Sequence, residues 1–150
     1  MFELAVTLII AAGSVVLLGY WFRYTCLLIV SAKTAHDYAG EVAAANQLAF
    51  LNVQSCLHQS AGTDLVGLHG ALEHDYALLS YLLKNAQSTT DEFSIETRML
   101  AAHYRVMNGW YRVSRNFSAE AARQALEDMS MVVAHLANVM GERNACSSAA

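Results

Sequence analysis

The most regular feature of the chain is an apolar run near its N-terminus. The run from Leu4 to Phe22 contains no charged side chain and is bounded by Glu3 and Arg23. At about 1.5 Å of rise per residue, a helix of this length covers roughly the 30 Å of a bilayer's hydrocarbon core. In lipid, a helix satisfies every backbone hydrogen bond of such a segment. The pattern predicts a transmembrane helix over residues 1–31.

The flanks of the run favour an uncleaved anchor over a signal peptide. No basic segment precedes it, and the bulky Tyr20, Trp21 and Phe22 occupy the place of a small-residue cleavage site. The basic residues Arg23 and Lys33 follow the run, so the positive-inside rule puts the N-terminus outside and the rest of the chain in the cytoplasm. We expect a single-pass protein of the cell membrane, in a bacterium the inner membrane. The anchor residues are Leu4, Leu8, Ile9, Val15, Leu17, Tyr20, Trp21, Phe22 and Arg23.

Beyond the anchor the pattern is helical throughout, and the chain contains no proline. We predict a first helix that continues from the anchor over about residues 2–58, followed by three helices ending near residues 87, 115 and 140. The predicted connections are Ser60–Gly62, Ser88–Asp91 and Asn116–Ser118. Gly141 is predicted to end the last helix, ahead of a small polar tail over residues 144–150.

Apolar residues at alternating steps of four and three predict the buried side of each later helix. For the second helix these are Leu65, His69, Leu72, Tyr76, Leu79, Leu83 and Ala86. For the third they are Ile95, Met99, Ala102 or His103, Val106, Trp110 and Val113. For the fourth they are Ala122, Leu126, Met129, Val133, Leu136 and Met140.

Short connections between long helices make neighbours antiparallel. The predicted fold is therefore all-α: a single transmembrane helix that continues into a cytoplasmic antiparallel bundle of three or four helices over residues 32–143. In the alternative arrangement the last three helices form the bundle alone, and the first helix joins another subunit.

Composition narrows the function classes. Hydrophobic residues make up 55% of the 150 residues and charged residues only 15%, so the chain needs a filled core or a buried partner surface. The net charge is −4 and the basic residues form no cluster, which argues against nucleic-acid binding. The three cysteines form no close motif, and their odd number suits a reducing compartment.

Six histidines raise the hypothesis of a metal or haem site. A di-iron bundle needs Glu-x-x-His on two helices, and no glutamate here has a histidine three residues later. The weak candidates are His69 and His103, with His74 or His135 near the same height of the bundle. The preferred interpretation is that His69 and His103 are hydrogen-bonded core residues, so we expect no metal and no cofactor.

Catalytic motifs are missing as well. The sequence contains no Gly-x-Ser-x-Gly and no phosphate-cradling glycine loop, and its carboxylate pairs fall at helix ends or on polar faces. We therefore expect no enzymatic activity.

One segment of the third helix has the residue types of an interface. Arg98, Arg105 and Arg112 recur every seven residues, close to Trp110 and Tyr111. In the alternative interpretation, Trp110 belongs to the core and the arginines pair with acidic faces. In the anchor, small residues around Gly13 allow another helix to approach closely. The predicted partner-binding residues are Gly13, Arg105, Trp110, Tyr111 and Arg112.

These observations favour a non-catalytic single-span protein that acts as an accessory, scaffold or assembly subunit of a larger membrane complex. Its expected partners are the lipid bilayer and other subunits or a second copy of itself, with no nucleic acid. The alternative is a membrane-tethered bundle that binds a metal or haem through histidines. A signalling module is less favoured, because almost no chain lies outside the membrane to sense a signal.

Overall fold

The computed structural model describes residues 1–32, 36–59, 64–85 and 94–148, which contain six α-helices and no strand. The predicted all-α class is confirmed over these ranges. The chain divides into two units, Met1–Lys33 and Thr34–Ala150. We call the second the helical unit and describe each unit by itself.

Helix α1 (Phe2–Ser31) makes up the first unit. It is long and apolar enough to cross a membrane, and no residue of its most apolar window is buried. Its apolar side chains lie all round the helix, so α1 has no polar face. The predicted anchor residues lie on it: Leu4, Leu8, Ile9, Val15, Leu17, Tyr20 and Trp21 are exposed, and Phe22 and Arg23 are half-buried.

The predicted continuous helix over residues 2–58 is wrong. α1 ends at Ser31, where the next residue turns to extended backbone. Two short helices follow, α2 (Ala39–Asn46) and α3 (Phe50–His58).

A buried carboxylate explains the break between α2 and α3. Gln47, with φ 54° and ψ 41°, takes the left-handed conformation that ends α2. The Asp75 carboxylate then accepts hydrogen bonds from the backbone N–H groups of Ala49 and Phe50, at 2.7 and 2.8 Å. It thereby satisfies two of the donors that a helix N-terminus leaves open. Asp75 is 1% exposed and belongs to another helix, so no local sequence pattern indicates this contact.

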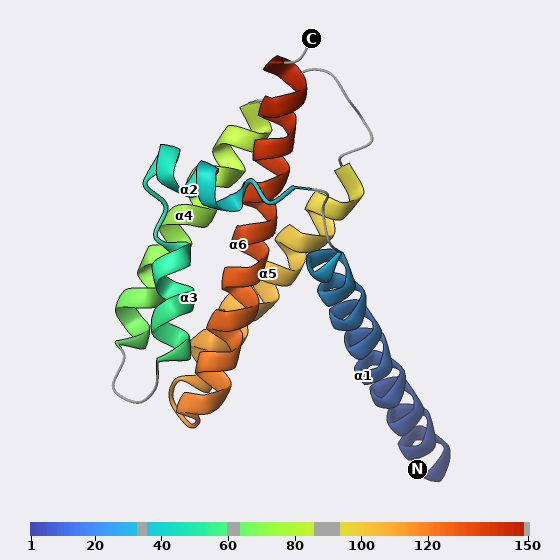
Figure 1. The fold of residues 1–150 in the computed structure, drawn as a ribbon. Helices are drawn as coiled ribbons and strands as arrows, with labels where there is room; N and C mark the ends of the chain where they lie inside the picture. Colours follow the sequence, from blue (N-terminus) through green and yellow to red (C-terminus); the bar gives the residue numbers. More distant parts are fainter. Residues whose placement is uncertain (33–35, 60–63, 86–93, 149–150) are drawn as a thin grey trace. The chain divides into compact units, whose positions relative to one another are not determined.

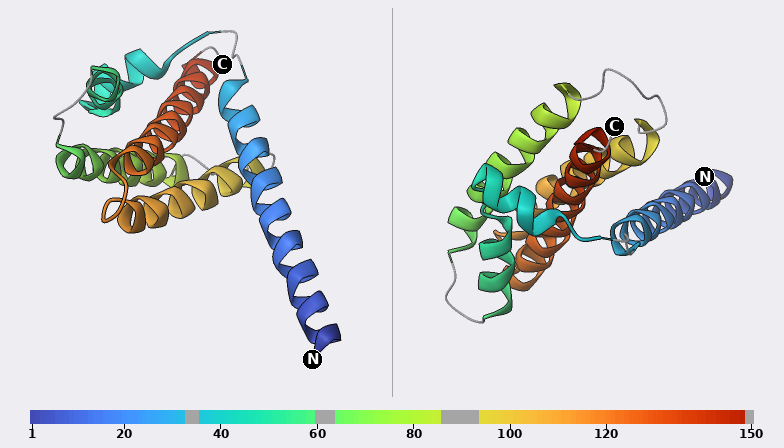
Figure 2. Two further views of the ribbon diagram at one scale, coloured as in Figure 1. Left: turned by 90° about the horizontal axis from the view of Figure 1, so that it is seen from below. Right: turned by 45° about the horizontal axis from the view of Figure 1, so that its top comes forward.

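Helix α6 (Ala119–Ser148) is the central helix of the helical unit. α2, α3, α4 (Leu65–Asn85) and α5 (Ser94–Ser114) all pack against it (Figure 1, Figure 2). Of its predicted core residues, Met140 is half-buried, and the other five are buried: Ala122, Leu126, Met129, Val133 and Leu136. The burial of this apolar face against four helices is the main stabilising contribution to the unit.

The predicted end of the last helix at Gly141 is wrong, because α6 runs on to Ser148. A Cβ at Gly141 would overlap the Tyr38 side chain and lie 3.2 Å from Val42 Cγ2. The glycine thus allows α2 to approach α6 closely instead of ending the helix. Residues 144–148 of the predicted polar tail are helical, and residues 149–150 lie outside the described ranges.

The predicted buried side of α4 is confirmed at its leucines in the middle and the C-terminal half of the helix. Leu72, Leu79 and Leu83 are at most 2% exposed, and Leu65, His69 and Tyr76 are half-buried. Ala86 and the predicted connections at 60–62 and 88–91 lie outside the described residues.

Candidate functional site

Helix α5 carries side chains suited to burial on two different faces. One face is buried in the helical unit and consists of Leu100, His103, Tyr104, Met107, Tyr111 and Ser114. The other is exposed and consists of Ile95, Ala102, Val106, Trp110 and Val113, with Phe117 just beyond the helix end. At 100° per residue, the two sets are centred roughly 100° apart around the helix axis. We call the second set the exposed face of α5.

The predicted buried side of this helix is therefore wrong. Ile95, Val106, Trp110 and Val113 were expected in the core, yet they are 47–69% exposed. His103 is buried, as one of the two predicted alternatives required, and Met99 is half-buried.

Aromatic and polar contacts with α4 explain why α5 is rotated this way. The rings of Tyr76 and Tyr104 stack with centroids 3.8 Å apart, and those of His69 and Tyr111 stack at 4.3 Å. The Tyr111 hydroxyl donates to the Leu65 carbonyl at 2.9 Å. Burial of an aromatic ring whose polar tip has a partner stabilises more than burial of a valine. Tyr111 meets this condition, whereas the buried Tyr104 hydroxyl has no hydrogen-bond partner among the described residues and Tyr104 is held inward by its ring stacking on Tyr76. The helix accordingly turns its tyrosines inward and leaves its valines outside.

A polar cluster spans α4 and α5 beside these rings. His69 Nε2 lies 2.8 Å from Asn108 Oδ1. Glu73 Oε1 accepts hydrogen bonds from Asn108 Nδ2 at 3.0 Å and from Arg112 Nη2 at 3.1 Å. Partial burial acts to raise the pKa of Glu73, but the hydrogen bonds from Asn108 and Arg112 and the nearby His69 outweigh it and lower that pKa. The cluster joins two helices through one carboxylate that stays ionised.

Both weak metal candidates lie in packed surroundings within the helical unit. His69 belongs to the polar cluster, and His103 is 2% exposed on the inner face of α5. Within the described ranges, no three histidine, cysteine, aspartate or glutamate side chains are grouped so as to hold a metal ion.

Arginines border one side of the exposed face. Arg98, Arg105 and Arg112 lie seven residues apart, so they form one row along the helix. Arg112 pairs with Glu73 at 3.1 Å. Arg98 and Arg105 are exposed, and no acidic side chain pairs with either of them among the residues that the structure describes. The exposed face thus has a cationic edge.

The predicted partner-binding residues fall in different surroundings. Arg105, Trp110 and Arg112 are exposed, on or beside the exposed face, whereas Tyr111 is 1% exposed and takes no part in the surface. On α1, Gly13 is exposed, and a Cβ there would meet nothing within 4 Å.

Sequence reasoning missed Ile95, Val106 and Val113 as candidate surface residues, because it assigned them to the core. The signal that was available is that one helix shows two stripes of non-polar residues.

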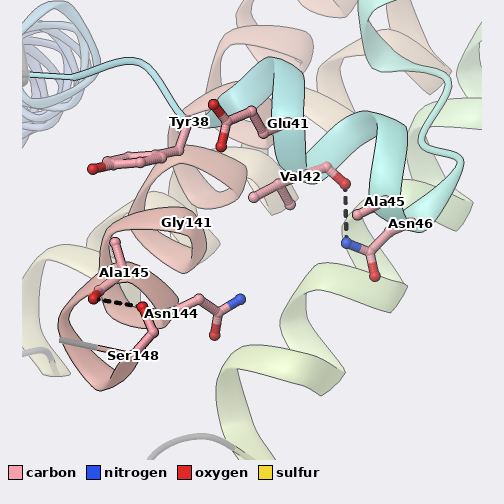
Figure 3. Close-up of a pocket in the computed structure, with 9 residues that line it drawn as sticks. All are labelled: Tyr38, Glu41, Val42, Ala45, Asn46, Gly141, Asn144, Ala145 and Ser148. Carbon is pink, nitrogen blue, oxygen red and sulfur yellow. Dashed lines mark hydrogen bonds between the residues drawn. The ribbon is translucent and has the colours of Figure 1, made fainter. Parts of the chain in front are cut away.

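A pocket of about 490 Å³ lies between α2 and the C-terminal part of α6 (Figure 3). Two of its polar side chains bond to their own helices: Asn46 Nδ2 donates to the Val42 carbonyl at 2.9 Å, and Ser148 Oγ donates to the Ala145 carbonyl at 2.9 Å. Among the lining residues, Glu41 is the one charged side chain, and besides Asn46 and Ser148 the others are Tyr38, Val42, Ala45, Gly141, Asn144 and Ala145. Few groups therefore converge on a ligand, which makes the pocket a weaker candidate than the exposed face of α5.

Comparisons of the chain with protein-family models, with curated proteins and with solved structures find no match.

Proposed function

We propose that the chain is a non-catalytic, single-span membrane protein whose helical unit binds another subunit of a membrane complex, as an accessory or assembly component. The exposed face of α5 carries this proposal. Val106, in the middle of α5, is 56% exposed, and Val113, near the C-terminal end of the helix, is 54% exposed. Rows of apolar side chains that a folded unit leaves open to water are typical of protein–protein interaction sites.

The residue types on and beside this face support binding to a protein. Trp110 is 47% exposed at one edge of the face, and Arg105 and Arg112 lie along the opposite edge. Tryptophan and arginine are the residue types most enriched where interface substitutions weaken binding strongly.

The hydrogen bonds that α1 makes within itself support a membrane location. Three of its hydroxyl groups donate hydrogen bonds to backbone carbonyls one turn earlier in the same helix. Thr7 Oγ1 donates to the Glu3 carbonyl, Ser14 Oγ to the Ile10 carbonyl and Thr25 Oγ1 to the Trp21 carbonyl, at 2.8–2.9 Å. This arrangement leaves no hydroxyl proton of these residues unpaired in lipid. We propose that α1 anchors the chain in the cell membrane, with its N-terminus outside and the helical unit in the cytoplasm.

Isolation of the full chain from its native membranes in a mild detergent tests the proposal. We expect the protein to elute with a second subunit in a fixed ratio, as measured by light scattering and mass spectrometry. Val106→Glu should abolish this co-elution, because it puts a charge in the middle of the exposed face. Leu51→Glu is the matched control, since Leu51 is a 45% exposed residue of α3. Recovery of the wild-type chain only as a monomer would overturn the proposal.

A further inference from the structure

We infer that the exposed face of α5 takes a single amphipathic helix of another subunit, whose apolar seam lies along α5 and whose one edge is acidic. This inference rests on the proposed function and names the chemistry of the partner at that same face. Three properties of the face carry it: its narrow width, its two small residues and its cationic edge.

The exposed face has the width and the register of a helix–helix seam. Four of its residues and the half-buried Met99 follow one another at steps of four, three, four and seven residues, within a stripe about 60° wide: Ile95, Met99, Ala102, Val106 and Val113. Such a repeat is the pattern by which two helices interlock their side chains. A single row of this kind offers little area to a flat lipid surface, so the width favours a helix as the occupant.

The stripe contains two small residues one heptad apart, Ala102 and Gly109. Gly109 is exposed on α5 between Val106 and Val113, and a Cβ there would meet nothing within 4 Å. A glycine inside a helix destabilises it relative to alanine, and no contact within the described part of the chain requires one here. Ala102 lies seven residues earlier, on the same side of the helix. Two small residues one heptad apart allow the side chains of a partner helix to enter between the larger ones.

The cationic edge specifies the charge of the partner. Arg98 and Arg105 lie two helical turns apart, and neither has an acidic partner in the described ranges. A helix that runs along the stripe and carries a carboxylate every seventh residue would place one beside each arginine. Arg112 already pairs with Glu73, so we expect it to contribute less.

The same edge argues against a second copy of α5 as the occupant. In an antiparallel symmetric pair, the arginine edge of one copy meets the arginine edge of the other. In a parallel pair, Arg105 and Arg112 meet the opposite edge, where Trp110 and Phe117 supply no acidic group. Both arrangements leave the arginines without an opposite charge.

A pair of synthetic peptides tests the inference on the full chain in nanodiscs. The two 21-residue helices share one apolar seam and differ only in the edge, which carries glutamate in one and lysine in the other at every seventh position. Trp21→Phe leaves Trp110 as the only tryptophan, because the chain has two, so its fluorescence reports binding. We expect the glutamate peptide to bind about tenfold tighter at low salt, with a preference that falls as salt is added.

Substitution of the arginines then identifies the edge. The double variant Arg98→Gln/Arg105→Gln should lose the preference for glutamate and keep the weaker binding that the seam provides. Arg115→Gln is the control outside the row, because it removes one positive charge of the same kind from an exposed arginine. That variant should keep the preference.

The inference would be overturned by equal affinity for the two peptides, by no binding of either, by a preference that survives the double substitution, or by quenching of Trp110 by brominated lipid in the absence of peptide. The last result would assign the face to a lipid surface. A dimer that Val106→Glu dissociates would assign it to a second copy and overturn the inference as well. The proposed function fails on a separate measurement, the absence of any second subunit from the native complex.

Discussion

The two faces of α5 both carry large apolar side chains, yet their surroundings are opposite. Leu100 and Tyr111 on one face are each 1% exposed, whereas Val106 and Val113 on the other are more than half exposed. On the buried face the Tyr111 hydroxyl donates to the Leu65 carbonyl of α4, whereas the Tyr104 hydroxyl is buried without a hydrogen-bond partner in the described part of the chain. The exposed face has purely apolar side chains beside an arginine row. Hydrophobicity alone therefore does not distinguish a core from an interaction face.

The largest expected difference between the two faces is in stability. Leu100→Ala removes a fully buried side chain and should lower the free energy of unfolding by about 2–5 kcal/mol. Val106→Ala should change it by about 0.5 kcal/mol or less, because Val106 lies at the surface. Urea unfolding of the full chain in detergent, followed by circular dichroism, measures both. Similar losses for the two variants would show that the exposed face is part of the core.

Glycine substitutions sharpen the comparison at a smaller scale. Gly141→Ala should destabilise the helical unit by about 1–3 kcal/mol, because the added methyl group meets Tyr38. Gly109→Ala should stabilise it by about 0.4–1 kcal/mol, since the new methyl group enters open space on a helix. The same unfolding assay gives both values. A destabilising Gly109→Ala would mean that something within the chain already covers this position.

The smallest expected effect is a pH dependence of the stability of the helical unit, caused by the partly buried His135. Burial lowers the pKa of His135 on α6, and the nearby Glu96 and Glu142 offset this only in part. Because the folded pKa lies below the unfolded value of about 6.5, the unfolded chain binds the proton first as the pH falls. The stabilising contribution is thus complete above about pH 6.5 and is lost as the pH falls toward the folded pKa.

Unfolding free energies at pH 7.5 and 5.5 measure this contribution. Between these two pH values, the free energy of unfolding of the wild-type chain should fall further than that of His135→Gln, by about 1 kcal/mol at most. His58→Gln is the control, because His58 is an exposed histidine at the end of α3. An identical pH dependence in the wild type and in His135→Gln would contradict the assignment.

Much of the fold could be predicted from periodicity, because burial of one helix stripe leaves a local pattern. This holds for the seam of α4 at Leu72, Leu79 and Leu83 and for the core of α6. The break at Gln47 could not be predicted, since its cause is the carboxylate of Asp75, a residue more than twenty positions away in the sequence. The role of Gly141 depends likewise on Tyr38, about a hundred residues earlier.

The candidate site was predictable in its residue types and not in its orientation. Arginine and tryptophan at Arg105, Trp110 and Arg112 indicated an interface, and these side chains are exposed. The valines between them were assigned to the core, because a hydropathy pattern does not contain the aromatic stacking between Tyr76 and Tyr104 that orients α5.

The central claim is that another subunit covers the exposed face of α5 in the membrane. Maleimide labelling of single cysteines tests it most directly, in a chain whose Cys26, Cys56 and Cys146 are replaced by alanine. Val106→Cys should react much more slowly in opened native membranes than after purification in a detergent that separates subunits. Leu51→Cys should react at the same rate in both. Equal labelling of Val106→Cys in the two preparations would contradict the claim.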